Sequence, residues 1–236
     1  MIKLKKVSKA ILSVFLFILA FSTTVFAAEI EIDTDVINML QESENIRLMT
    51  KEEYFQVIAK SRDISVKEAE KITNKIIANH QRRIKQVGES SENDDDISRS
   101  IKWGTDYRDE AGGYYNFAWV FKRVDAGGGM LVEASVPVII YVYNSYGREF
   151  IEVNEDDCKA YAVGNGDYTY KSISARAKLI KDKVHLNTSG VVEVKKSAAA
   201  DMGISIEQLV NFGFSISGDR YARKTVTISH VEDLYG

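Results

Sequence analysis

The candidate nucleophile and base in this 236-residue chain are Cys158 and one of two histidines, His185 or His230. A catalytic cysteine needs a histidine or another positive group that lowers the pKa of its thiol. Cys158 instead follows the three acids Glu155-Asp156-Asp157, and no spacing brings either histidine to it. We therefore expect an unreactive, buried cysteine, and we retain a cysteine-dependent hydrolase as an alternative hypothesis.

Metal and cofactor binding are not indicated. The histidines and the single cysteine lack the spacing of a metal site, and we expect His80 at the surface of a lysine-rich helix. Asp94-Asp95-Asp96 has neither the alternate spacing nor the turning glycine of a calcium loop. Gly127-Gly128-Gly129 precedes a strand-like segment, whereas a phosphate cradle opens a helix, so it is interpreted as a hairpin loop. We predict no metal and no cofactor.

Aromatic residues are dense between 114 and 121. At a period of two, every second residue from Tyr115 to Phe121 is aromatic, which is typical of a sheet face in a core. The alternative is a face that binds carbohydrate or peptide, with Trp103, Tyr114 and Tyr115 as its candidate residues.

A basic stripe is the second candidate binding surface. Lys67, Lys71 and Lys75 are spaced four residues apart, so they share one face of a helix. Such a face contacts an anionic envelope polymer or a membrane surface, or it is simply solvated, and charge runs favour the solvated interpretation.

The segment 28–88 is expected to be helical. Thr50-Lys51-Glu52-Glu53 and Ser65-Val66-Lys67-Glu68 both fit the capping box, and apolar residues recur at helical spacing after the second box. The short connection between them predicts a helical hairpin, preceded by a weaker helix over 35–49. Ala59 to Ala69 and Ala199 to Leu209 have the register of a helix-turn-helix, which helix packing alone explains.

The segment 98–236 is expected to be β-rich. Predicted strands cover 130–143, 149–153, 168–181, 191–195, 212–217 and 221–231, with a short helix over 197–209. Pro137, the only proline, predicts an edge strand or a bulge. Gly164-Asn165-Gly166-Asp167 predicts a hairpin, and Asn187-Thr188-Ser189-Gly190 predicts a turn.

Residues 1–27 have the order of a secretory signal peptide: four lysines, an apolar run and a small-residue cleavage site before Ala28. Their removal takes four of the 31 basic residues and none of the 34 acidic ones, so the net charge falls from −3 to −7. This charge argues against nucleic-acid binding. We predict a secreted, extracellular chain with no stable membrane span after processing.

These patterns predict an α+β protein with four segments. They are a signal peptide (1–27), a helical segment (28–88), an acidic linker (89–97) and an antiparallel β-sandwich or barrel-like domain (98–236). The leading functional hypothesis is a non-enzymatic binding protein at or outside the bacterial cell envelope, whose partner is a protein, a carbohydrate or an anionic envelope polymer. A secreted toxin or antimicrobial factor is a further alternative.

Overall fold

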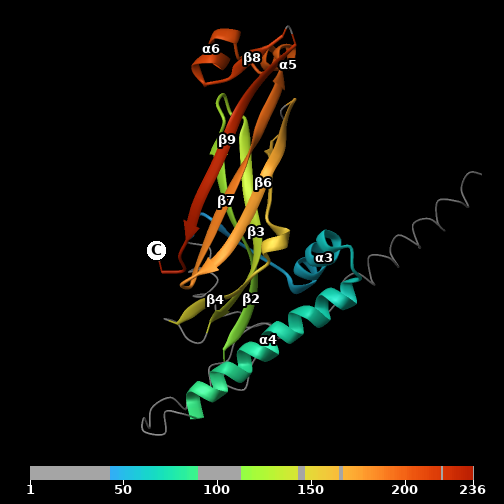
Figure 1. Ribbon diagram of the computed structural model, residues 1–236, viewed down its shortest axis with the longest axis vertical. Helices are drawn as coiled ribbons and strands as arrows, with labels where there is room; N and C mark the ends of the chain where they lie inside the picture. Colours follow the sequence, from blue (N-terminus) through green and yellow to red (C-terminus); the bar gives the residue numbers. More distant parts are fainter. Residues whose placement is uncertain (1–42, 90–112, 143–146, 165–166, 219, 236) are drawn as a thin grey trace, which may run out of the picture. The chain divides into compact units, whose positions relative to one another are not determined.

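A computed structural model describes residues 43–89, 113–142, 147–164, 167–218 and 220–235. These residues form four α-helices, one 3-10 turn and nine strands in two antiparallel sheets (Figure 1). The chain is therefore a mixed α+β protein, as expected. Its strands belong to two separate sheets, so the barrel-like alternative is wrong. The predicted signal peptide and acidic linker lie outside the described residues.

The first sheet has five strands in the order β1-β2-β3-β4, with β5 paired to β3 beside β4. Its members are β1 (Ile46–Met49), β2 (Tyr114–Asp125), β3 (Leu131–Val142), β4 (Arg148–Val153) and β5 (Lys159–Val163). The 3-10 turn η1 (Glu155–Asp157) connects β4 to β5.

The second sheet has four strands in the order β6-β7-β9-β8. They are β6 (Tyr168–Ile180), β7 (Lys183–Lys195), β8 (Ser215–Ser217) and β9 (Tyr221–Glu232). The helices are α3 (Lys51–Arg62), α4 (Val66–Glu89), α5 (Lys196–Asp201) and α6 (Ile206–Asn211). The single helix expected over 197–209 is thus two short helices separated by a turn.

Both predicted capping boxes form at the starts of α3 and α4. The Thr50 hydroxyl accepts the Glu53 N–H while the Glu53 carboxylate accepts the Thr50 N–H. Ser65 and Glu68 make the same reciprocal pair, at 3.2 and 3.0 Å. Asp63, in the left-handed region at φ 53°, ends α3 and turns the chain toward α4. Local hydrogen-bond chemistry therefore determines where the two long helices begin.

The weak helix expected over 35–49 is wrong for its described part. Ile46–Met49 form β1, which pairs antiparallel with β2 so that Ile46 faces Val120 and Met49 faces Phe117. A segment of four residues has little preference of its own, and the free edge of β2 supplies its hydrogen bonds.

Pro137 does not mark an edge strand, because β3 has neighbours on both sides. The alternative, a bulge, agrees with the register shift between Ile139 and Ile140 in the pairing of β3 with β4. On one side β3 pairs first with β5, up to Ser135, and then with β4, from Val138 onward. Pro137 lies in the break between these partners, where its carbonyl accepts the Asn154 N–H at 3.0 Å. The N–H and C=O of one residue point to the same side of an antiparallel strand. The N–H that proline lacks would therefore point into the break between β5 and β4, where no strand residue is paired with it.

Two predicted turns in the β region are wrong. The strands on either side of Gly164-Asn165-Gly166-Asp167, β5 and β6, belong to different sheets, so the chain crosses between sheets there. Asn187-Thr188-Ser189-Gly190 lies inside β7. A Cβ on Gly190 would lie 2.4 Å from the Tyr170 ring and 2.5 Å from the Lys171 carbonyl oxygen, so this glycine allows a close approach within the sheet.

The buried side chains form two clusters. The larger contains residues of both sheets, mainly valines and alanines. The smaller lies between the helices and the first sheet and contains Tyr54, Phe55, Ile58, Ala59, Ala69, Ile77, Tyr115, Phe117, Ile139, Tyr141 and Ile151. We call this side of the first sheet its outer face. Of the aromatic residues expected in the core between sheets, Tyr115 and Phe117 are thus covered by α3 and α4 instead.

Candidate functional site

A buried carboxylate lies on the outer face of the first sheet. It is outside the smaller buried cluster, which α3 and α4 cover. Glu133 of β3 is only 1% exposed. Its Oε2 accepts a hydrogen bond from Arg123 Nε at 2.7 Å, and its Oε1 lies 3.5 Å from Arg47 Nη2. The Tyr161 hydroxyl also donates to Oε1. Because a buried charge is costly unless it is paired, these three partners explain how the carboxylate is tolerated there.

The two arginines lie against the same ring. The guanidinium carbons of Arg47 and Arg123 are 5.0 and 5.5 Å from the centroid of Phe121, which is cation–π distance. Their side chains remain 45% and 46% exposed. In the described part of the chain, Glu133 and Phe121 are their only partners. Each guanidinium has five N–H donors, so both arginines retain donors that a ligand can use.

Two further aromatic side chains border this group. Trp119 faces Arg47 across β1 and β2 and is half-buried, whereas Tyr161 of β5 is 41% exposed. Burial, and then the hydrogen bond to Glu133, raise the pKa of Tyr161, so the hydroxyl stays protonated and keeps donating at neutral pH. We call Arg47, Trp119, Phe121, Arg123, Glu133 and Tyr161 the aromatic–arginine cluster.

The chemistry of this cluster suits the binding of an anion. Fixed guanidinium donors recognise a carboxylate or phosphate with two parallel hydrogen bonds, and the neighbouring rings offer apolar surface. The carboxylate of Glu133 is buried and held by three partners, so it is not placed as a base. The arrangement therefore favours recognition of an anionic ligand.

The tyrosines predicted to line a binding face are interior. Tyr114 is 2% exposed and Tyr115 is 0% exposed, the former in the cluster shared by the sheets and the latter beneath the helices. Trp103 lies outside the described residues. The aromatic segment does reach the surface, but through Trp119 and Phe121, which the sequence analysis assigned to a core face.

The three residues of the hydrolase hypothesis are not brought together. Cys158 is buried, and burial raises the pKa of its thiol to about 12, so the thiolate is scarce at neutral pH. His230 Nε2 bonds the Glu232 carboxylate at 2.7 Å, and His185 projects from β7 on the other side of that sheet. Within the described residues no hydrogen bond connects Cys158 to either histidine.

The basic stripe predicted on α4 is present. Lys67, Lys71 and Lys75 are all exposed. The opposite side of the helix is buried through Ala69, Thr73, Ile77 and His80. The stripe thus lies on the solvent side of an amphipathic helix. This position agrees both with contact to an anionic surface and with a face that is simply solvated.

The position expected for His80 is wrong, because this side chain is 4% exposed. Its Nδ1 lies 3.0 Å from the Tyr115 hydroxyl and its Nε2 3.0 Å from a Glu149 oxygen. The His80 ring also packs edge-on against Tyr141 at 4.7 Å. A histidine at helical spacing from Ala69 and Ile77 belongs to the buried side of α4, which the surrounding lysines obscured.

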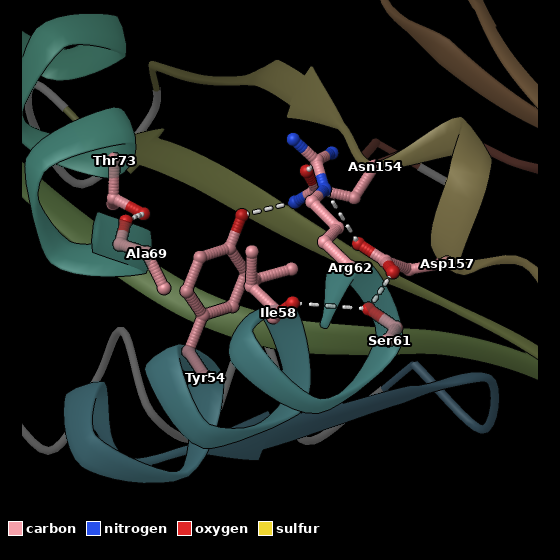
Figure 2. Close-up of polar contacts among 8 residues, drawn as sticks. All are labelled: Tyr54, Ile58, Ser61, Arg62, Ala69, Thr73, Asn154 and Asp157. Carbon is pink, nitrogen blue, oxygen red and sulfur yellow. Dashed lines mark hydrogen bonds and ion pairs between the residues drawn. The ribbon is translucent and has the colours of Figure 1, made fainter. Parts of the chain in front are cut away.

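A buried polar network fixes α3 to the turn after β4 (Figure 2). Ser61 donates to the Asp157 carboxylate, and Arg62 donates from Nη2 to Asn154 Oδ1 at 2.8 Å. The Asn154 amide in turn donates to the Tyr54 hydroxyl. Asp157 is 0% exposed and lies 3.6 Å from Arg62 Nε. Hydrogen bonds between buried side chains favour one docking geometry, so this network positions the helix on the sheet.

The aromatic–arginine cluster could have been inferred from the sequence. Glu133 is the only charged residue in the twelve of β3, which otherwise contain mostly valine, isoleucine and alanine. A lone acid in an apolar strand must find a cation, because charged residues are rarely buried unpaired. That reasoning points to basic residues on the neighbouring strands, of which Arg123 is directly opposite.

Comparison with known protein families, with curated proteins and with solved structures gives no match. No helix of the described residues is long and apolar enough to cross a membrane. Those residues also contain no group of histidine, cysteine and acidic side chains arranged to hold a metal ion. Fold and site together define a mixed α+β protein in which two half-exposed arginines flank a buried carboxylate on one of two antiparallel sheets.

Proposed function

We propose that this chain is a secreted, non-enzymatic binding protein that acts at or outside the bacterial cell envelope. Its aromatic–arginine cluster binds a carboxylate-bearing segment of a partner protein. The observation that carries the proposal is the pair of half-exposed guanidinium groups, Arg47 and Arg123, held beside Phe121 by the buried Glu133.

A protein partner fits this chemistry best. Tryptophan, tyrosine and arginine are the residue types that contribute most to protein interfaces, and here all three lie together on a sheet face. Because Glu133 already orients the arginines, little side-chain entropy is lost when a carboxylate binds. The surrounding rings would exclude water from that ion pair.

Export is supported by the order of residues 1–27, which is that of a cleavable signal peptide. Amino-terminal sequencing of secreted protein should find Ala28, or a residue close to it, as the first residue. Recovery of intact Met1 in a membrane fraction would contradict export by cleavage.

Two finer features of the fold belong to the same proposal. The buried cluster that both sheets share supports a β-sandwich, and the three-residue connection between α3 and α4 supports a helical hairpin. In this arrangement the hairpin and the aromatic–arginine cluster occupy different parts of one sheet face.

The direct test uses the mature chain, residues 28–236, and a fluorescent copolymer of glutamate and tyrosine as the probe. We expect Arg47→Gln to weaken binding about tenfold or more, the usual loss at an interface hot spot. Arg47 is the safer choice because its contact with Glu133 is the longer one, 3.5 Å. Lys67→Gln removes the same charge from α4 and should change affinity by less than about twofold.

Thermal unfolding must show that both variants are folded. Equal weakening by Arg47→Gln and Lys67→Gln would mean that the probe senses only net charge, and the proposed site would be wrong. Arg47→Lys separates geometry from charge, since lysine retains the charge but not the planar pair of donors. If Arg47→Lys binds as well as the parent chain, recognition by the guanidinium is refuted.

A further inference from the structure

The second sheet has an open face that the proposed function does not use. Cross-strand partners in an antiparallel sheet point to the same side, so the register assigns each residue to a face. The side of β6, β7 and β9 that is turned away from the shared core carries six basic residues. They are Lys171, Arg176, Lys178, Lys183, Lys195 and Arg223.

Two of these basic residues are neutralised within the protein. Arg223 pairs with Glu193 at 2.5 Å, and Lys183 pairs with Asp233 at 2.6 Å. The other four are exposed, and within the described part of the chain they have no hydrogen-bond or ion-pair partner. Three of them, Lys171, Arg176 and Lys178, lie on β6. Positive charge is thus concentrated on one strand of a chain whose net charge is −3.

Small polar side chains fill the space between the basic ones. Ser174 and Ser189 face each other across β6 and β7 with oxygens 2.8 Å apart, and the Ser229 hydroxyl donates to Asn187 Oδ1 at 2.9 Å. Thr225 and Thr227 continue this polar surface along β9 and are exposed. Hydroxyl and amide groups donate to phosphate and carboxylate oxygens and accept from sugar or polyol hydroxyls.

We propose that this face binds a linear anionic polymer that carries hydroxyl groups, a polyol phosphate or an acidic polysaccharide. Charge complementarity selects a polyanion: the positive face attracts it although the whole chain is acidic. Adjacent strands are about 4.8 Å apart and alternate residues of one strand about 7 Å apart. The face therefore offers a two-dimensional grid of donors, which suits an extended polymer with repeated charges.

A lipid surface is the less suitable occupant. Membrane-surface binding relies on bulky apolar side chains that insert between headgroups. Serine, threonine and asparagine predominate in the centre of this face, beside Arg176 and the half-buried Val191. Of the exposed apolar residues of these strands, Ile180 and Val231 lie at one end, and Ile173 lies alone in the bulge of β6. A polymer bound along the polar centre would therefore contact more residues of this face than an inserted membrane surface would.

The test measures binding of the mature chain to poly(glycerol phosphate) by isothermal titration calorimetry at about 50 mM and about 200 mM salt. Polygalacturonate replaces phosphate by carboxylate in a second arm, and dextran is the neutral control. The variant R176Q/K178Q removes two of the unpartnered charges from β6. The matched control K67Q/K71Q removes two exposed charges from α4, so both variants have the same net charge.

We expect the β6 variant to bind at least about tenfold more weakly at the lower salt concentration and to show a smaller salt dependence. The α4 variant should stay within about twofold of the parent chain. Binding in the phosphate or the carboxylate arm supports the proposal, and the tighter arm identifies the anion. A thermal melt of each variant confirms that it is folded.

Three results would overturn the proposal. Equal losses for both variants would show attraction by net charge alone. Tighter binding to phosphatidylglycerol vesicles than to either polymer would assign the face to a membrane. No binding in either arm would leave these charges the role of keeping the edge strand β6 from pairing with other chains. Arg47→Gln should not affect polymer binding, so failure here and failure of the aromatic–arginine site are distinguishable.

Discussion

The outer faces of the two sheets differ in what covers them. On the first sheet, α3 and α4 cover Tyr115, Phe117, Ile139, Tyr141 and Ile151. On the second sheet the corresponding side is wet and carries serines, threonines and basic residues. Both sheets contribute mainly small aliphatic residues to the buried cluster that they share. A sheet face therefore attracts a helical layer only where its alternate residues are large and apolar.

The same difference is visible along single strands. All residues of β3 except Leu131 are buried, because one side faces the second sheet and most of the other faces the helices and Glu133's partners. In β7, buried and accessible residues alternate along the strand. A continuous apolar run thus indicates two covered faces, whereas alternation indicates one.

Removal of the helical layer should have the largest effect. A fragment that begins at Ser98 lacks α3, α4 and β1, so it exposes the outer face of the first sheet and the edge of β2. We expect this fragment to aggregate or to melt without cooperativity, because exposed apolar faces and strand edges promote association. Circular dichroism with size-exclusion chromatography measures both properties. A cooperative melt of a monomeric fragment would show that the β part folds independently.

Single residues on the two faces should differ strongly in their effect on stability. Phe117→Ala removes a side chain that packs 4.7 Å from the Tyr54 ring, and we expect a loss of about 3–5 kcal/mol in the free energy of unfolding. Thr227→Ala on the open face should change it by no more than about 0.5 kcal/mol. Urea unfolding measures both. Similar values for the two variants would remove the distinction between a covered and an open face.

The polar network beneath α3 should contribute an intermediate amount. Asn154→Ala removes the donor to the Tyr54 hydroxyl and the acceptor for Arg62, both in a buried setting. An unsatisfied buried group costs about 1–3 kcal/mol, so we expect a loss in that range. Asn187→Ala breaks a hydrogen bond on the open sheet, where water can replace it, and is the matched control. A loss for Asn187→Ala as large as that for Asn154→Ala would contradict this assignment.

The smallest expected effect on the free energy of unfolding comes from Glu152, and it depends on pH. Burial raises the pKa of Glu152, with Arg62 acting in the opposite direction. Because the pKa is higher in the folded state, stability falls as pH rises through the interval between the unfolded and folded values. Above that interval the buried carboxylate is ionised in both states and its cost is constant. Glu152→Gln should therefore be more stable than the parent chain near pH 7, with the difference vanishing below about pH 4. Urea midpoints at the two pH values decide, and a variant that is less stable near pH 7 would reverse the sign.

Much of the local structure could be predicted from the sequence. The capping boxes at Thr50 and Ser65 place both long helices, and β3, β4 and β9 occupy segments that branched and aromatic residues mark. These features depend on chemistry within a few residues. Features that depend on distant partners could not be predicted. Only the edge of β2 makes a strand of Ile46–Met49, and only the assignment of β5 and β6 to different sheets shows that Gly164 to Asp167 form no hairpin.

The β6 strand shows how a correct alternation can still misplace residues. Strict alternation would place Ile173 on one face with Ala175, Ala177 and Leu179, yet it is 67% exposed. The register shifts between Ser172 and Ser174, so a bulge leaves Ile173 without a cross-strand partner. A bulge inserts one residue and reverses the parity of all later ones. The aromatic–arginine cluster also depends on strand pairing. It combines residues of β2, β3 and β5 with Arg47 of β1, a segment that was wrongly expected to be helical.

The two ends of the described chain meet, and this has a consequence for the order in which the protein can assemble. The Ser43 hydroxyl donates to Glu232 Oε1 at 2.5 Å across 189 positions of sequence, and β1 pairs with a strand about seventy residues later. Contacts between distant residues form late because a long loop must first close. A ribosome or a translocation pore that releases the chain from its amino-terminus delivers Ser43 long before Glu232. The contact between Ser43 and Glu232 therefore forms only after the last strand, β9, has been released.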